Sequence, residues 1–245
     1  GASHLYTREF MEEVRSHLTE GGIFVQWIDI NFVNSALLKS LGATLLDVFS
    51  HVRLYRPADH ALVFLASTAP IEPEKLLVRN GRKISTFYRR HGVHGVHDLA
   101  AMLTFNTEQL RGYCEDAALN TDDSNLLATH SLRLMRPGEK KRLEDSLAAY
   151  DVISETESLR TQLDLDPGYL GQVLQSNQQR LRADAIVNSI EDPMSRKIAE
   201  ARMQLMRGAL RDCAKSLQQI QADDKENRVA MEIEAMLAIA ERRSV

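Results

Sequence analysis

One polar side chain interrupts an otherwise apolar stretch near the start of the chain, and it is the first candidate for chemistry. Gln26 lies within residues 23–30, and all the remaining residues from Ile23 to Ile28 are aliphatic or aromatic. An amide at the carboxyl end of a sheet strand can accept a hydrogen bond from a substrate ammonium group. A buried glutamine can equally be satisfied by neighbouring backbone, and both interpretations stay open.

Two adjacent carboxylates are the second candidate. Asp122 and Asp123 follow Asn120 and Thr121, and they could hold a polycationic substrate, or a hard metal ion if further oxygen ligands converged on them. The same residue types are typical of turns and helix caps, which is the more ordinary interpretation. We therefore treat the pair as substrate-binding candidates and expect no metal site.

Histidines at three nearby positions invite a zinc interpretation, which the intervening residues disfavour. Glycines separate His91, His94 and His97 and oppose the helix that would align them as ligands. No cysteine or glutamate stands at ligand spacing beside them. We expect a loop here.

A basic segment departs from the acidic average of the chain. Arg79, Arg82, Lys83, Arg89 and Arg90 are interleaved with two aromatic residues and could serve an anionic partner, although a solvated surface is the simpler interpretation. The net charge of −4 gives no general reason to expect nucleic acid or a membrane as partner. Two cysteines far apart in the sequence are typical of a reducing compartment, so we expect a cytoplasmic protein.

Local patterns predict the elements that would position these residues. Thr7 is a possible N-cap of a first helix, which Gly21 and Gly22 would end, and Asn34 is a possible N-cap of a second. The run at residues 23–30 is apolar on both faces, which is typical of a buried strand in a parallel sheet. Strands at residues 51–56 and 61–66 must be antiparallel because a parallel return needs a longer crossover.

The second half of the chain has a different character. Short helices are predicted at residues 98–103 and 106–114, the second with a capping box of Asn106 and Gln109. Residues 137–245 read as entirely helical. Within them, residues 201–217 resemble one tetratricopeptide unit, with Asp192 and Pro193 forming a turn before it; a generic helical bundle is the alternative.

Four ordered motifs resemble the C-terminal half of the spermidine/spermine synthase-like family, over roughly residues 1–136. They are Leu5-Tyr6-Thr7-Arg8-Glu9-Phe10, Gly21-Gly22-Ile23-Phe24-Val25-Gln26-Trp27, Phe49-Ser50-His51-Val52, and Leu119-Asn120-Thr121-Asp122-Asp123 with Leu126-Leu127. The resemblance implies a class I methyltransferase-like Rossmann fold. It also implies transfer of an aminopropyl group from decarboxylated S-adenosylmethionine to a polyamine, with an aspartate taking the amine proton.

The resemblance gives roles to individual residues. It implies that Gln26 lies near the polyamine and that Ala2 and Leu5 touch the adenine ring of the cofactor. Three departures qualify it. None of the twelve glycines forms the Gly-x-Gly turn of a cofactor loop, and the proton-accepting aspartate would stand upstream of residue 1. The loop that joins the last two strands has shrunk to residues 57–59, so it lacks the tyrosine of the family.

The fold class that we expect is α/β. Residues 1–69 would be the C-terminal half of a Rossmann-like sheet with an antiparallel edge hairpin, residues 70–136 a family-specific extension, and residues 137–245 an all-helical, possibly tetratricopeptide-like region. The strand at residues 23–30 would then have an open apolar edge where a parallel neighbour belongs. We expect the partner of this edge to be the missing N-terminal half of the fold, and we expect the chain alone to self-associate.

Two functions follow from these patterns. The chain would be a portion of a spermidine-synthase-like transferase that is inactive alone, binds no cofactor by itself, and contains no catalytic residue. Decarboxylated S-adenosylmethionine, or S-adenosylmethionine, is the cofactor implied for the parent enzyme. Alternatively, the helical region would be a protein-interaction module on an inactive scaffold.

Overall fold

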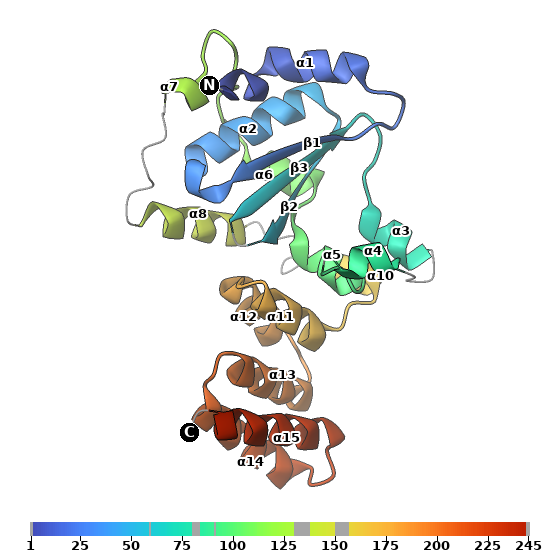
Figure 1. Ribbon diagram of the computed structural model, residues 1–245, viewed down its shortest axis with the longest axis vertical. Helices are drawn as coiled ribbons and strands as arrows, with labels where there is room; N and C mark the ends of the chain where they lie inside the picture. The colour runs from blue at the N-terminus through green and yellow to red at the C-terminus, as the bar shows by residue number, and fades with distance from the viewer. Residues whose placement is uncertain are drawn as a thin grey trace. The chain divides into compact units, whose positions relative to one another are not determined.

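The computed structural model describes residues 2–58, 60–79, 84–90, 92–129, 138–149 and 157–243, and its fold is α/β (Figure 1). The chain divides into two compact units. The sheet unit comprises Gly1–Ser85 and Met102–Thr156, and the helical unit comprises Thr86–Ala101 and Glu157–Val245. This division places residues 86–101 with the helical tail, whereas the three expected segments kept them with residues 70–136.

The sheet unit contains four strands and the helices around them. Its elements are η1 (Ala2–Tyr6), α1 (Arg8–His17), β1 (Phe24–Asp29), η2 (Ile30–Phe32), α2 (Ser35–Val48), β2 (His51–Ala58), β3 (Ala61–Ser67), α3 (Pro73–Arg79), β4 (Leu103–Phe105), α6 (Thr107–Tyr113), α7 (Leu126–Thr129) and α8 (Glu139–Ala148). The predicted order of helix, strand, helix, strand and antiparallel strand is confirmed. The three-residue strand β4 was not predicted.

The strands form one sheet in the order β1-β3-β2-β4, and every pair of neighbours is antiparallel. Because β1 and β2 are both antiparallel to β3, they run in the same direction with β3 between them. In the register, Val63 of β3 lies between Trp27 of β1 and Tyr55 of β2. The connection from β1 through α2 to β2 is therefore a crossover between two parallel, non-adjacent strands.

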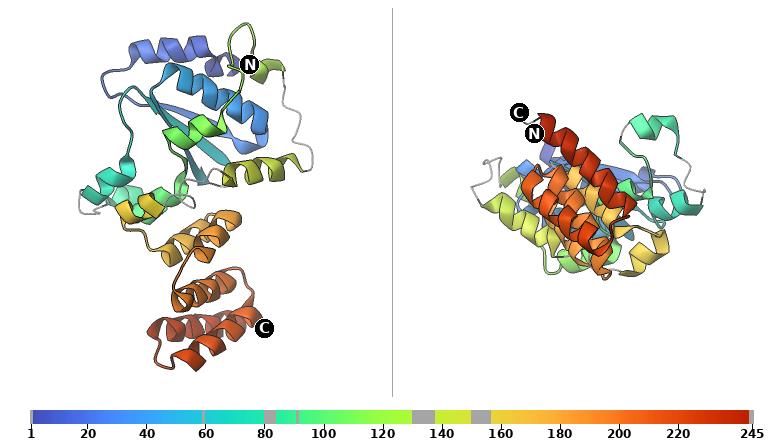
Figure 2. Two further views of the ribbon diagram at one scale, coloured as in Figure 1. Left: turned by 180° about the vertical axis from the view of Figure 1, so that it is seen from behind. Right: turned by 90° about the horizontal axis from the view of Figure 1, so that it is seen from below.

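One face of this sheet carries the core. Ile28, Phe64 and Leu54 belong to a buried cluster that also contains side chains of α1, α2, α6 and α8. Viewed from behind in the left panel of Figure 2, α2 and α6 lie over the strands. Burial of apolar surface stabilises a fold by about 25 cal/mol for each Å² removed from water. The hydrophobic effect therefore holds the helices to this face of the sheet.

The opposite face of the sheet is open at β1. Val25 and Trp27 are 57 % and 51 % exposed, and Val63 and Leu65 beside them on β3 are half-buried. The prediction that β1 is a strand buried on both faces is therefore wrong. Its apolar run alternates between a covered side and a side over which the described residues place no helix (Figure 1).

The phase of the hydrogen bonds shows which backbone groups of β1 point away from β3. The Ile30 N–H donates to the His60 carbonyl at 2.8 Å, so Ile30 and every second residue before it bond to β3. The backbone groups of Val25 and Trp27 therefore point to the other edge, where no strand of the described chain lies. Among the described residues, β1 therefore has one edge without a strand partner, as predicted. The only strand partner of β1 that the structure describes is antiparallel.

A buried ion pair covers the part of this opposite face that β2 forms. The Arg53 Nη1 donates to the Glu74 carboxylate of α3 at 2.9 Å and to the Ile71 carbonyl at 2.6 Å. The Tyr55 hydroxyl donates to the same carboxylate at 2.7 Å. Burial, and then the adjacent negative charge of Glu74, raise the pKa of Tyr55 far above its usual value. The phenol is therefore a neutral donor at any physiological pH.

Side-chain caps explain where two of the helices begin. Asn34 Oδ1 accepts from the Leu37 N–H, and Asn106 Oδ1 accepts from the Gln109 N–H, both at 2.9 Å, which confirms these two predicted N-caps. The Gln109 side-chain oxygen is buried without a partner, so the capping box is incomplete. Thr7 precedes α1, but its hydroxyl donates back to the His4 carbonyl at 2.9 Å and makes no cap bond.

Cys114 packs against α2 at a point of close approach. A Cβ on Gly42 would lie 2.5 Å from the Cys114 Sγ, so only glycine fits this position of the helix. Burial of the thiol raises its pKa from 9.0 to about 12. The folded protein therefore keeps this proton at pH values where the unfolded chain releases it.

The buried thiol should make stability depend on pH in the alkaline range. Above pH 9 the unfolded state binds fewer protons at Cys114 than the folded state, so stability falls as the pH rises toward about 12. We expect a slope of at most about 1.4 kcal/mol per pH unit from this group. Urea denaturation of the wild type and of Cys114→Ala between pH 8 and pH 11 measures it. Parallel pH profiles for the two proteins would contradict the assignment.

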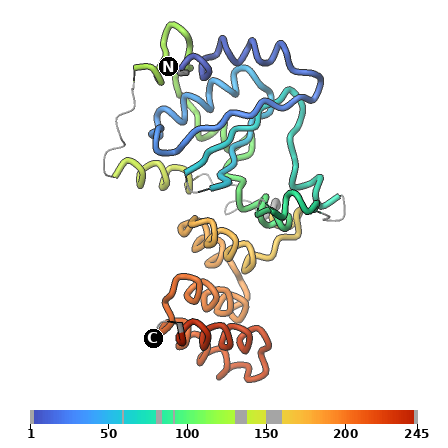
Figure 3. Tube along the Cα trace, viewed as in Figure 1, coloured from blue at the N-terminus to red at the C-terminus, as the bar shows by residue number. Residues whose placement is uncertain are grey.

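The helical unit is built from helices joined by short turns. Its elements are α4 (Thr86–Arg90), α5 (Val96–Met102), α10 (Glu157–Leu163), α11 (Pro167–Ser176), α12 (Arg180–Asn188), α13 (Pro193–Met206), α14 (Leu210–Asp223) and α15 (Arg228–Arg243). Helix α11 packs against α12 and α13, and α13 packs against α14 and α15. The trace in Figure 3 follows these helices as successive hairpins. The prediction of a helical tail is confirmed over the part that the structure describes.

Aspartate caps begin two of these helices. The Asp166 and Asp192 carboxylates accept from the backbone N–H groups of Tyr169 and Ser195 at 2.5 and 2.7 Å, and a proline follows each aspartate. Hydrogen bonds from Ser195 lower the pKa of Asp192. The predicted turn at Asp192 and Pro193 is thus the N-terminal cap of α13.

Candidate functional site

Gln26 lies on β1, on the face that the helices cover. It shares this face with Phe24 and Ile28, whose side chains join the core, and it is half-buried. The Tyr6 hydroxyl of η1 donates to the Trp27 carbonyl at 3.2 Å, and the Gln26 side chain lies beside the same phenol. Burial raises the pKa of Tyr6, and the neighbouring Gln26 amide opposes part of that rise.

The phenol favours one orientation of the Gln26 amide. Because the Tyr6 proton is given to the Trp27 carbonyl, the phenol oxygen can only accept, so the amide nitrogen is the part of Gln26 that suits it. The amide oxygen then keeps its acceptor capacity for another donor. An amide oxygen at half-buried depth is a group that can accept from an ammonium ion.

Asn120 is the side chain around which the neighbouring loop is arranged. It is fully buried; its amide nitrogen donates to the Tyr6 carbonyl at 2.9 Å, and its amide oxygen accepts from the Leu126 N–H at 2.7 Å. Its backbone N–H donates to the Thr44 hydroxyl of α2, and its carbonyl accepts from the Arg8 N–H, both at 2.8 Å. Asn120 therefore joins η1, α1, α2 and α7.

The two candidate carboxylates lie in a turn that follows Asn120. The Ser124 N–H donates to the Thr121 hydroxyl at 3.1 Å and closes this turn. Asp122 and Asp123 are both exposed, and the Asp122 N–H donates to the Glu9 carboxylate of α1 at 3.0 Å. Glu9 thus adds a third carboxylate to this surface, which sequence reasoning did not identify.

Tyr6 connects the two halves of the candidate site. Its carbonyl accepts from Asn120 and its ring reaches Gln26 and Trp27. The structure therefore brings Leu5, which is half-buried in η1, into the same region as Gln26 and the loop at residues 120–123. Ala2 begins η1, and its side chain lies outside the described residues. The roles of these residues in binding stay predictions.

The other sequence candidates have structural partners or fall outside the described ranges. The His97 imidazole accepts from the Asp166 N–H at 3.0 Å and packs edge-on against Tyr169, while His91 lies outside the described residues. The Asp98 carboxylate, in the first turn of α5, accepts from the His94 and Gly95 N–H groups that precede the helix. Among the residues that are described, no group of three histidine, cysteine, aspartate or glutamate side chains could hold a metal ion.

The basic segment is divided by residues outside the described ranges. Arg79 ends α3, and Arg89 and Arg90 end α4, with all three exposed. Arg82 and Lys83 are not among the described residues. The structure therefore gives this segment no defined charged surface.

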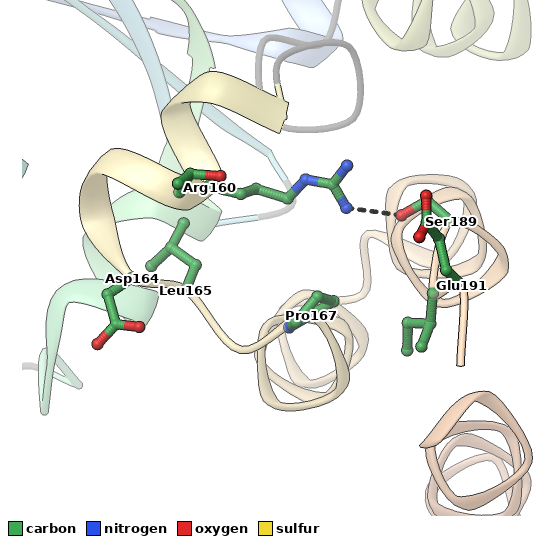
Figure 4. Close-up of a pocket in the computed structure, with 8 residues that line it drawn as sticks. Arg160, Asp164, Leu165, Pro167, Ser189 and Glu191 are labelled. Carbon is green, nitrogen blue, oxygen red and sulfur yellow. Dashed lines mark hydrogen bonds between the residues drawn. The ribbon is translucent and has the colours of Figure 1, made fainter. Parts of the chain in front are cut away.

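A surface pocket of the helical unit contains side chains of both charges. Arg160 of α10 reaches across it and donates to the Ser189 hydroxyl at 2.7 Å, as Figure 4 shows. Asp164, Glu191 and Pro167 also line the pocket. Because its one cation is tied to a hydroxyl and its carboxylates are spread along the wall, the pocket offers no converging set of groups for catalysis.

Comparison of the chain with protein-family models, with curated proteins and with solved structures finds no match. The function must therefore be argued from the geometry described above. In the part of the chain that is described, no helix is both long and apolar enough to cross a bilayer.

The structural role of Asn120 can be separated from the surface role of its neighbours. Asn120→Ala removes the side-chain hydrogen bonds to the partly buried Tyr6 carbonyl and Leu126 N–H, which should lower the free energy of unfolding by about 2–4 kcal/mol. Asp123→Ala, in the same turn but exposed, should leave stability unchanged. Urea denaturation followed by circular dichroism measures both. Equal stabilities for the two variants would contradict this role.

Proposed function

We propose that the sheet unit is the C-terminal half of a class I methyltransferase-like Rossmann domain, in a transferase that resembles spermidine synthases. The parent enzyme would move an aminopropyl group from decarboxylated S-adenosylmethionine to a polyamine amine. The observation that carries this proposal is the arrangement of β1, β3 and β2, in which an antiparallel strand lies between two parallel strands.

The positions of α1 and α2 support the same topology. Both helices pack on one face of the sheet, and α2 connects β1 to the parallel strand β2. Crossovers between parallel strands are almost always right-handed. If α1 is also a crossover helix, a strand that leads into it must therefore lie on the side of β1 away from β3. That position is the edge to which the Val25 and Trp27 backbone groups point.

The side chains around η1 would form the amine side of the site. The Gln26 amide oxygen would accept from a substrate ammonium, and Asp122 and Asp123 would attract the remaining positive charge of a polyamine. Leu5, half-buried in η1, and Ala2 are apolar and would suit the face of an adenine ring. The cofactor supplies the activated aminopropyl group; none of the twelve glycines of residues 1–245 forms a Gly-x-Gly loop that would hold it. The chain alone is therefore proposed to be inactive.

Spermidine binding tests the amine side directly. We expect the Gln26 side-chain amide resonances to shift when spermidine is titrated into the chain, and the dissociation constant to rise about tenfold or more in Gln26→Leu, because a hydrogen bond to a charged donor contributes about 1.5–3 kcal/mol. Gln218→Leu, at an exposed position of α14, is the matched control and should bind as the wild type does.

Two results would contradict the proposal. Spermidine affinity that is equal in Gln26→Leu and in the wild type would remove Gln26 from the amine site. Aminopropyl or methyl transfer by the isolated 245-residue chain would show that its missing parts are not required.

A second candidate function belongs to the helical unit. We propose that its stacked hairpins act as a protein-interaction module, as a tetratricopeptide-like array would. Support comes from the contacts of α11 with α13 and of α13 with α15, in which the first helix of each hairpin packs on the first helix of the next.

A further inference from the structure

The two complete hairpins of the helical unit share one turn geometry. The turn between α11 and α12 has Gln178 at φ +60°, and the turn between α13 and α14 has Gly208 at φ +73°. Both turns place a hydrogen bond from the residue after this position to a carbonyl five residues earlier, at 2.9 Å in each case. The hairpins therefore repeat with an offset of 30 residues, from 178 to 208.

Buried side chains repeat with the same offset. Gly171 of α11 corresponds to Ala201 of α13, and a Cβ on Gly171 would lie 2.7 Å from the Val187 Cγ2 of α12. Each hairpin carries a matching set, in which a small residue is followed by aliphatic residues four and seven positions later. In the first hairpin these are Ala183 and Val187, buried on α12, and the half-buried Ile190 just past the end of that helix; in the second they are Cys213, Leu217 and Ile220, all buried on α14.

Each first helix of a hairpin has two apolar sides when it stands inside the array. Ala199 of α13 faces the preceding hairpin, since a Cβ on Gly168 of α11 would lie 3.6 Å from its Cβ. Ala201 and Leu205 face the other way and belong to the cluster that α13 forms with α14 and α15. The second side is the one on which α14 packs.

Helix α15 corresponds to the first helix of a third hairpin, and only one of its two apolar sides is covered. Ile233 and Leu237 are buried in the cluster with α13 and α14, as Ala199 and Met203 are buried at positions 34 residues earlier. At the same shift, Ala201 and Leu205 correspond to Ala235 and Ile239, which are exposed.

Together with Met231 and Ala238, these two residues form the α15 stripe at positions i, i+4, i+7 and i+8 of one helix face. Met231 is 56 % and Ile239 is 54 % exposed. The outermost helix of a stacked array needs a polar outer face to stay soluble. The α15 stripe does not meet that requirement, and no second helix covers it among the residues that the structure describes.

We propose that the α15 stripe binds an amphipathic helix of a partner protein, which completes a third hairpin in trans. The chemistry of this helix follows from the two hairpins in the chain. It carries a small residue opposite Ala235, followed by aliphatic residues four and seven positions later, as α14 does. The small side chains of Ala235 and Ala238 allow the close approach that Gly171 and Ala201 allow in the complete hairpins.

The inference concerns residues 167–243 and is independent of the transferase proposal. It rests on the interaction role proposed for the helical unit, and it gives that role a surface and a class of partner. If the α15 stripe were not used but another surface of the helical unit bound partners, the interaction role would stand and this inference would fall.

A peptide of residues 209–224, which is the chain's own second helix, serves as the probe. With Cys213→Ala, the residue of the equivalent position in α12, it cannot form disulfides. We expect the labelled peptide to bind the full chain in a fluorescence anisotropy titration. Ala235→Glu should weaken binding about tenfold or more, because it places a charge in the contact. Ala185→Glu makes the same change at an exposed position of α12 and should bind as the wild type does.

Further measurements make the result decisive. Circular dichroism should show equal helix content for the two variants, because both positions are exposed in helices. A peptide that also carries Leu217→Glu should not bind. Absence of binding by the first peptide, or equal affinities of the Ala235→Glu and Ala185→Glu chains, would overturn the proposal. Sedimentation that shows a dimer lost in Ala235→Glu would overturn it too, because the occupant would then be a second copy of the chain.

Discussion

The structure of the sheet unit depends on burying one face of a four-stranded sheet. Ile28, Leu54 and Phe64 form the sheet side of this core, and side chains of α1, α2, α6 and α8 form its helical side. Every helix of this layer is held by the same apolar surface, so the positions of η1 and of the Asn120 loop follow from it. Asn120 fixes how these elements are arranged, because four of its polar groups each bond to a different element. If one of these elements moved, the group bonded to it would lose its partner.

Much of the fold could be predicted because its signals are local. Asn34 and Asn106 cap helices through bonds to residues three positions later, and the short gap between β2 and β3 allows only an antiparallel pair. Errors arose where a pattern has more than one solution. An apolar run such as that of β1 can be buried on two faces or on one, and the choice depends on which elements cover it. Three residues between two helices give too little pattern to predict β4.

The candidate site could be predicted only as a set of residue types. Gln26, Asp122 and Asp123 were identified because amides and carboxylates suit an amine. The contacts that define their surroundings are long-range: Asn120 bonds to Tyr6 across 114 residues, and Glu9 meets Asp122 across 113. No local pattern encodes such pairs. The same limit applies to the helical unit, where the second copy of the hairpin is visible in its turn geometry and is faint in its sequence.

The difference between the two turns of the helical unit bears on how stable each hairpin is. Gln178 adopts a left-handed conformation that costs an L-residue about 1–2 kcal/mol and that glycine adopts freely, as Gly208 does in the second hairpin. The helices α11 and α12 are also shorter, at 10 and 9 residues against 14 and 14 in α13 and α14. In a stacked array, stability is the sum of each hairpin's own contribution and of its contacts with neighbours. We therefore expect the hairpin of α13 and α14 to be the more stable of the two, and the hairpin of α11 and α12 to depend on its contacts with it.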